Sequence, residues 1–121
     1  MPNNKTSNGH KYDLEERCFV FSGDIRIYVK NLPKITQNFE DGKQLIRSSG
    51  SMGANYIEAN EALSKKDFLM RLKISKKESK ETIYWLRLTQ PNEHNEKERN
   101  RLIDEATQIM KIFGSIIEKS K

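Results

Sequence analysis

Lysine and arginine side chains are concentrated between residues 64 and 88, where they could bind phosphate groups. This segment holds eight basic and three acidic residues, a net charge of +5, and the whole chain is also +5, with 22 basic and 17 acidic residues. The rest of the chain is therefore neutral overall, with 14 basic and 14 acidic residues. At about 100° per residue on a helix, five cations fall within one narrow arc and Lys76 stands at its edge. The residues predicted to bind nucleic acid are Lys66, Lys73, Lys76, Lys77, Lys80 and Arg87. The alternative is a solvated charged face.

The same segment carries a second apolar stripe that includes the single tryptophan of the chain. A monomeric four-helix bundle needs one apolar stripe per helix, so a second stripe indicates a protein–protein interface. A wide core that wraps further around the helix is the alternative. On the preceding segment, three polar residues could pair directionally between subunits, or could simply be solvated in a monomer. The residues predicted to form an oligomer interface are Arg47, Asn55, Glu58, Met70, Ile74, Trp85 and Leu88.

The residues needed for catalysis are scarce. The chain has two histidines and one cysteine, and it lacks a Gly-rich phosphate loop, a cysteine pair and a metal-binding His-Glu spacing. Cys18 lies within an apolar pattern, which favours a small core residue over a reactive thiol. We therefore expect a protein that is not an enzyme and that uses no cofactor or metal.

Length and composition predict one small domain. A chain of 121 residues can bury enough surface for one core without disulfides or metal. There is no apolar run of about 18 residues, and residues 1–12 lack the apolar region of a signal peptide. These features predict a cytoplasmic protein without a membrane partner, in which a flexible tail (1–12) precedes the folded domain (13–121).

Four segments show the apolar spacing of helices. The first runs from about residue 13 to Pro33 and is wide, because Phe19, Val20, Ile27 and Val29 add to its apolar face. The second covers about 41–60. Its centre, 48–53, is rich in Ser and Gly, so a loop is the alternative to a helix for that stretch. The third opens at Ser64, and the fourth follows Asn95 as a plausible N-cap.

Four amphipathic helices with short connections predict an all-α, antiparallel up-down-up-down four-helix bundle. Strand alternation is absent from all four segments. Gly53 lies beside the apolar stripe of the second segment, so it is expected to mark a close approach between two helices.

Three stretches resemble one protein family. Residues 51–59, S-M-G-A-N-Y-I-E-A, are similar to the S-x-x-A-N-I-x-E-G signature of small four-helix bundle proteins encoded by intervening sequences in bacterial large-subunit ribosomal RNA genes. Residues 64–68, S-K-K-D-F, resemble the S-x-K-E-F helix opening of that family. Residues 72–86 resemble its L-x-I-A-x-x-S-x-x-E-x-x-Y-W-L helix. The chain departs from the family pattern at Tyr56, Ala59 and Ser75.

The resemblance implies a ring-like homopentamer without enzymatic activity. It also implies kinship with the accessory variability determinant of diversity-generating retroelements, a basic pentamer that binds nucleic acid and partners a reverse transcriptase. The sequence and the resemblance together predict a non-enzymatic oligomer that binds nucleic acid, RNA favoured over DNA, through its basic third helix. The alternative is a scaffold homo-oligomer that binds a protein partner, such as a reverse transcriptase, and has no nucleic-acid role.

Overall fold

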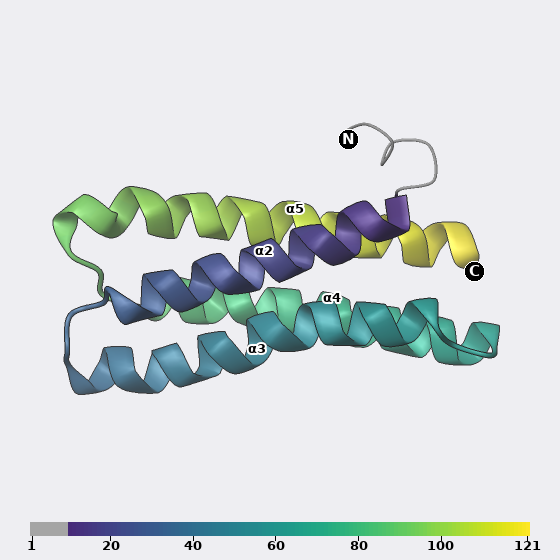
Figure 1. Ribbon diagram of the computed structural model, residues 1–121, viewed down its shortest axis with the longest axis horizontal. Coiled ribbons are helices and arrows are strands. Elements are labelled where there is room, and N and C mark those ends of the chain that lie inside the picture. The colour runs from purple at the N-terminus through teal and green to yellow at the C-terminus, as the bar shows by residue number, and fades with distance from the viewer. Residues whose placement is uncertain (1–9) are drawn as a thin grey trace.

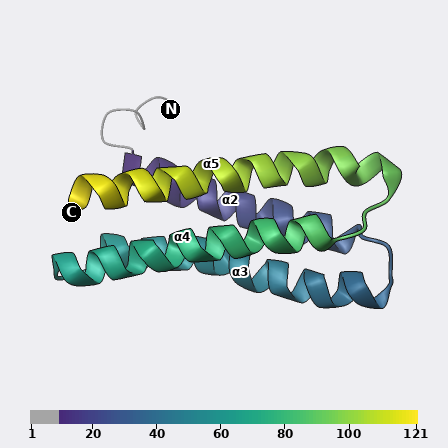
Figure 2. The ribbon, with the colours of Figure 1, turned by 180° about the vertical axis from the view of Figure 1, so that it is seen from behind.

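The computed structural model describes residues 10–121, with side chains from Leu14 onward. The helices run alternately up and down, and each lies beside the next in the chain (Figures 1 and 2). This arrangement confirms the predicted all-α four-helix bundle. The expected tail lies outside the described residues as far as residue 9. The elements are α2 (His10–Lys30), α3 (Thr36–Asn60), α4 (Lys65–Leu88), η1 (Glu93–Asn95) and α5 (Glu96–Ser120).

Two helices begin earlier than their apolar spacing indicates. Helix α2 includes residues 10–12, which the sequence placed in the tail, and α3 begins at Thr36, five residues before the expected start. Helix α3 continues through 48–53, so the loop interpretation of that stretch is wrong. The expected start of α4 is confirmed, because Ser64 Oγ accepts a hydrogen bond from the Asp67 amide at 3.1 Å.

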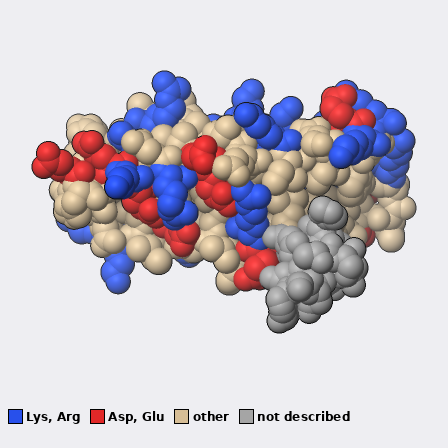
Figure 3. Space-filling model, turned by 90° about the horizontal axis from the view of Figure 1, so that it is seen from above, with Lys and Arg blue, Asp and Glu red and all other residues tan. Residues whose placement is uncertain are grey.

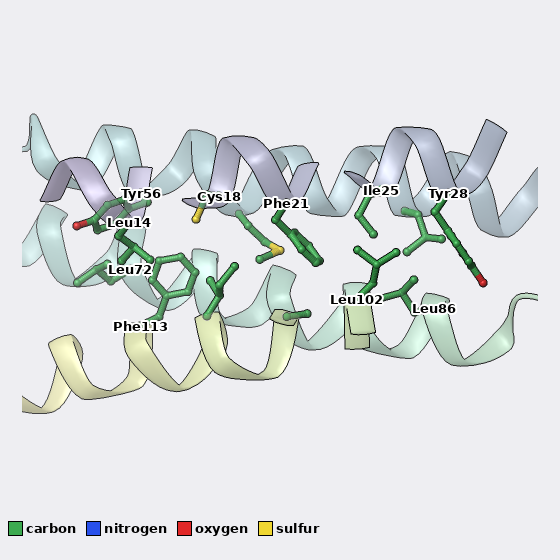
Figure 4. Close-up of a cluster of buried hydrophobic side chains, with 14 of the residues drawn as sticks. Leu14, Cys18, Phe21, Ile25, Tyr28, Tyr56, Leu72, Leu86, Leu102 and Phe113 are labelled. Atoms are coloured by element: carbon green, nitrogen blue, oxygen red, sulfur yellow. The ribbon is translucent and has the colours of Figure 1, made fainter. Parts of the chain in front are cut away.

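The core lies between the four helices, and every helix contributes to it (Figure 4). All six apolar positions at the three- and four-residue spacing of the first predicted segment are buried; five lie in α2 and Leu32 follows its end. They are Leu14, Cys18, Phe21, Ile25, Tyr28 and Leu32.

Small hydroxyl side chains line the contact between α3 and α4. Ser48 Oγ lies 2.7 Å from Thr82 Oγ1, and Ser75 Oγ donates to the Met52 carbonyl at 2.9 Å. Because these side chains are short, the two helices can approach closely, and because their hydroxyls are hydrogen-bonded, burying them costs little. This contact explains how a Ser-rich stretch becomes the buried face of a helix.

Two glycines of α3 allow a close approach to α2. A Cβ atom at Gly53 would lie 3.1 Å from Cys18 Cβ, and one at Gly42 would lie 2.8 Å from Val29 Cγ1. The expectation for Gly53 is confirmed, and Gly42 makes the tighter contact.

Helix α2 packs mainly on α3 and touches α5 only sparsely. Side-chain bonds reinforce this sparse contact. Arg17 bonds both carboxylate oxygens of Glu105 at 2.7 and 2.9 Å, and Arg101 pairs with Asp24 at 2.9 Å. Ionic pairs thus join two helices whose backbones approach each other at few positions.

Hydrogen bonds of the Asn38 side chain join the α2–α3 and α4–α5 connections at one end of the bundle. Asn38 Nδ2 donates to the carbonyls of Pro33 and Gln90, both at 3.0 Å, and Asn38 Oδ1 accepts from the Gln90 amide at 2.9 Å. Thr89, which precedes Gln90, forms a second bond of this kind: its hydroxyl lies 2.7 Å from the hydroxyl of Tyr28 on α2. Buried Asn38 therefore ties the segment after α2 to the segment after α4.

Candidate nucleic-acid interface

The basic residues of α4 occupy the side that faces away from the core. The buried face of this helix is formed by Leu72, Ser75, Glu78, Ser79, Thr82 and Leu86. A different set of positions carries the six cations predicted from the sequence, and all six are exposed. We call this set the lysine row: Lys66, Lys73, Lys76, Lys77, Lys80 and Arg87.

The lysine row is not neutralised by any side chain that the structure describes. Among side chains 14–121, none of its six members forms an ion pair with an aspartate or glutamate. Positive charges that lack an acidic partner remain available to an external anion. This distribution agrees with the prediction of a basic face, while binding itself stays a prediction.

Cations elsewhere in the bundle are more often paired. Figure 3, which looks down on the side formed by α2 and α5, shows acidic and basic groups interleaved. Ion pairs of the described residues outside α4 include Arg17–Glu105, Lys43–Glu40, Arg101–Asp24, Arg101–Glu98 and Lys121–Glu118. Other exposed lysines, such as Lys30, Lys97 and Lys119, also form no ion pair, so the lysine row is distinguished by the concentration of unpaired cations on one helix face.

Lys76 differs from the rest of the lysine row because it reaches toward α5. A Cβ atom at Gly114 would lie 3.5 Å from Lys76 Nζ. The ammonium group of Lys76 therefore lies next to Gly114 of α5, on the side of the lysine row nearest that helix.

A hollow opens along the first half of the lysine row. Its volume is about 470 Å³, and it combines apolar and basic side chains. The lining residues are Lys66, Leu69, Met70, Lys73, Ile74 and Lys77. Apolar surface thus lies directly between cations on the same helix face.

The polar residues predicted for the oligomer interface are largely engaged within the chain. Arg47 pairs with Glu78 at 3.3 Å and with Glu81 at 2.9 Å. Asn55 accepts a hydrogen bond from Arg71 at 2.9 Å and donates to Ser51. The bonds of Arg47 to Glu78 and Glu81 and of Arg71 to Asn55 join α3 to α4, so Arg47 and Asn55 have a structural role that the sequence did not reveal.

Glu58 is exposed and makes no ion pair among the described side chains. Of the three predicted polar interface residues, it alone presents an unpaired charge to solvent.

The apolar residues predicted for the interface divide into two groups. Trp85 is half-buried and packs against the core, as the alternative of a core that wraps further around the helix predicts. Met70 and Leu88 are each 45% exposed, and Ile74 is intermediate. The stripe is therefore anchored on the core at Trp85 and open to solvent at Met70 and Leu88.

Three apolar residues of α2 remain on the surface. Phe19 is 74% exposed, Val20 is 51% exposed and Ile27 is 60% exposed. The sequence placed them on a widened apolar face, whereas the structure puts them outside the core. The spacing could not distinguish a wide core from an uncovered surface.

No group of three histidine, cysteine, aspartate or glutamate side chains among the described residues is arranged to hold a metal ion. Burial raises the pKa of Cys18 to about 12, so its thiol is protonated at neutral pH and serves as a core residue. None of the helices between residues 10 and 121 has an apolar stretch long enough to traverse a bilayer.

Fold and surface define the chain as a small four-helix bundle with a basic face. Residues 10–115 match the family described as 23S rRNA-intervening sequence protein, and the chain belongs to this family. Its fold resembles a crystal structure of a protein of unknown function from the S23 ribosomal protein family of Bacteroides thetaiotaomicron, with a TM-score of 0.76 and 32% identity over 89% of this chain and 97% of the other. No curated protein matches the chain at a significant level.

Proposed function

We propose that this protein is a non-enzymatic homo-oligomer that binds RNA through the lysine row of α4. The observation that carries the proposal is the row of exposed cations without acidic partners. Phosphate groups bind such cations with release of counterions, which supplies most of the affinity when base sequence is not read. The description of the family, which refers to intervening sequences of 23S rRNA, favours RNA over DNA.

The oligomeric part of the proposal rests on exposed apolar surface and on the family pattern. A ring of five subunits would place five lysine rows on one particle, and linked sites raise the apparent affinity for one long strand. Enzymatic activity has no part in the proposal, because phosphate binding by a row of lysines requires no catalytic group.

A second candidate function is that of a scaffold that binds a protein partner, such as a reverse transcriptase. It is favoured by the exposed side chains of Phe19, Val20 and Ile27 on α2, a helix that lies away from the lysine row. Exposed apolar surface is a feature of protein–protein interaction sites.

Charge reversal on α4 tests the RNA-binding function. Lys73→Glu, Lys77→Glu and Lys80→Glu together change the formal net charge by three times −2, from +5 to −1. The wild-type protein should bind RNA in a filter assay at low salt, with a log-log salt slope of roughly −0.7 per phosphate contacted on single strands. The triple variant should lose that binding.

The matched control reverses three exposed lysines elsewhere: Lys30→Glu, Lys97→Glu and Lys119→Glu. This control has the same net charge of −1, so it should weaken RNA binding only through the general field of the protein. If both triple variants lose RNA binding equally, the loss is caused by the change in net charge and not by the lysines of α4. Undetectable binding by the wild-type protein would contradict the RNA-binding function and leave the scaffold function as the better candidate.

A further inference from the structure

An exposed tyrosine stands within the lysine row. Tyr84 is 56% exposed. Residues three, four and seven positions apart share one side of a helix. Tyr84 follows Lys80 by four positions and Lys77 by seven, and it precedes Arg87 by three. Its ring therefore lies among the cations that the proposed function assigns to phosphate groups.

The Tyr84 ring is supported from one side by Trp85. The two ring centroids are 5.1 Å apart at an interplanar angle of 76°, an edge-to-face contact. Trp85 itself packs against the core, so it is a fixed support. A ring held in place in the free protein loses little conformational freedom when a ligand binds to it.

The hollow beside Lys73 extends the same pattern toward the start of α4. There, the apolar side chains of Leu69, Met70 and Ile74 lie between lysines. The distance along the helix from Lys66 to Arg87 is about 30 Å at roughly 1.5 Å per residue. Over this length, one face of one helix offers phosphate-binding cations and, at Tyr84, an aromatic surface on which the flat face of a base could rest.

We propose that Tyr84 stacks on a nucleic-acid base and that the ligand of the lysine row is single-stranded. The inference rests on the proposed function, since it concerns the same face of α4. In a duplex, the base faces are covered by neighbouring bases, and a helix-face aromatic cannot reach them. In a single strand, the bases turn out and stack on aromatic side chains, while neighbouring cations bind the phosphates. Tyr84 thus determines which form of nucleic acid binds.

Fluorescence anisotropy with two labelled probes tests this inference. One probe is a single-stranded oligouridylate of about ten nucleotides, which is long enough to span the row, and the other is an RNA duplex of the same length. Tyr84→Leu keeps an apolar side chain but removes the aromatic face, and Tyr84→Phe keeps the face. We expect Tyr84→Leu to weaken single-strand binding by roughly five- to 100-fold and Tyr84→Phe to retain it. Neither substitution should alter the weaker binding of the duplex.

Trp85 offers a second measurement, because it is the only tryptophan of the chain and touches Tyr84. Oligouridylate should change its fluorescence in the wild-type protein, and the duplex should not. The matched control is Phe19→Leu, which changes another exposed aromatic ring on a helix that packs on α3 and α5. This variant should bind both probes like the wild type. Circular dichroism and light scattering confirm that each variant keeps its helices and mass.

Two results separate the stacking role from the RNA-binding function. If Tyr84→Leu binds the single strand like wild type while the Lys73, Lys77 and Lys80 reversal abolishes binding, Tyr84 does not stack and the lysine row alone is the site. If the wild-type protein binds neither probe at low salt, the RNA-binding function fails and the stacking role fails with it.

Discussion

At the scale of single residues, the contact between Arg17 and Glu105 is the clearest polar determinant of the bundle. It is bidentate, with Nε and Nη2 of the guanidinium at 2.7 and 2.9 Å from the two carboxylate oxygens. Bidentate pairs hold their geometry better than single contacts between long side chains. The hydrogen bonds from Arg17 lower the pKa of Glu105, whose burial acts in the opposite direction.

The lowered pKa predicts a specific loss of stability in acid. A carboxylate whose pKa is lower in the folded state stabilises the fold above its ordinary pKa of 4.5, and this contribution is lost as pH falls through the folded value. Glu105→Gln removes the titrating group. The melting temperature of this variant should therefore be below that of wild type at pH 7 and should approach it toward pH 3.

The control for this measurement is Glu16→Gln, which changes an exposed glutamate that forms no ion pair among the described side chains. Its melting profile should parallel that of wild type over the whole range. A constant difference between Glu105→Gln and wild type from pH 7 to pH 3 would contradict a titrating contribution from this pair.

Individual contacts were the part that the sequence could least predict. Arg17 and Glu105 are 88 positions apart, and helical spacing indicates which side of a helix a residue occupies but not which residue of another helix it meets. The roles of Arg47 and Asn55 between α3 and α4 escaped prediction for the same reason. Cys18 was predictable because burial depends only on its place in the apolar pattern of its own helix.

At the scale of elements, helix existence followed from the apolar spacing, whereas helix starts did not. The first turn of α3 is mostly polar, so residues 36–40 carry no periodic signal. Their place in the helix depends on Asn38, which bonds to Pro33 and Gln90 across the end of the bundle. A start that depends on such tertiary bonds cannot be predicted from local sequence.

Two glycine-to-alanine substitutions should have opposite effects on helix packing. Alanine is favoured over glycine within a helix by roughly 0.5–1 kcal/mol. At Gly23, no atom lies within 4 Å of the added Cβ, so Gly23→Ala should stabilise the protein by about that amount. At Gly42, the added Cβ would meet the β-branched Val29 at 2.8 Å, and the overpacking should cost about 1–3 kcal/mol.

Urea unfolding measures both effects as shifts of the midpoint. Gly23→Ala should raise the midpoint and Gly42→Ala should lower it, with similar slopes in all three proteins. An increase in stability for Gly42→Ala would show that α2 and α3 can separate slightly at that position without loss.

At the scale of the whole molecule, two groups of exposed apolar residues lie on α2 and α4, and Phe39 and Ile57 are exposed on α3. Phe19, Val20 and Ile27 belong to α2, and Met70 and Leu88 belong to α4. Two unlike patches on one subunit fit a head-to-tail contact, in which a patch of one copy meets the other patch of the next. Such contacts form rings when the rotation between copies closes, which is how the proposed pentamer would arise.

Adding charge to the α4 patch should disrupt the proposed assembly. Met70→Lys with Leu88→Lys places two ammonium groups on surface that the assembly would bury, at a cost that favours the free subunit. Multi-angle light scattering should give a multiple of 14.2 kDa for wild type and a mass near 14.2 kDa for the double variant. Circular dichroism should be unchanged, because both side chains are already partly solvated.

Leu63→Lys is the control for the assembly measurement, since Leu63 lies between α3 and α4 and is fully exposed. It should keep the wild-type mass. A wild-type mass of 14.2 kDa would exclude the oligomer at the concentration measured, and a double variant with the wild-type mass would move the interface away from Met70 and Leu88.

The hydrogen bond between the Gln90 amide and Asn38 makes this amide a probe of how the bundle opens at one end. The Gln90 N–H lies just past the end of α4, outside any helix, where an amide would normally exchange its hydrogen quickly with solvent. Here it donates to Asn38 Oδ1, 52 positions away. Deuterium can replace that hydrogen only while this bond is open. The exchange rate at this one position therefore measures the free energy of opening the contact between α3 and the segment after α4 at this end of the bundle.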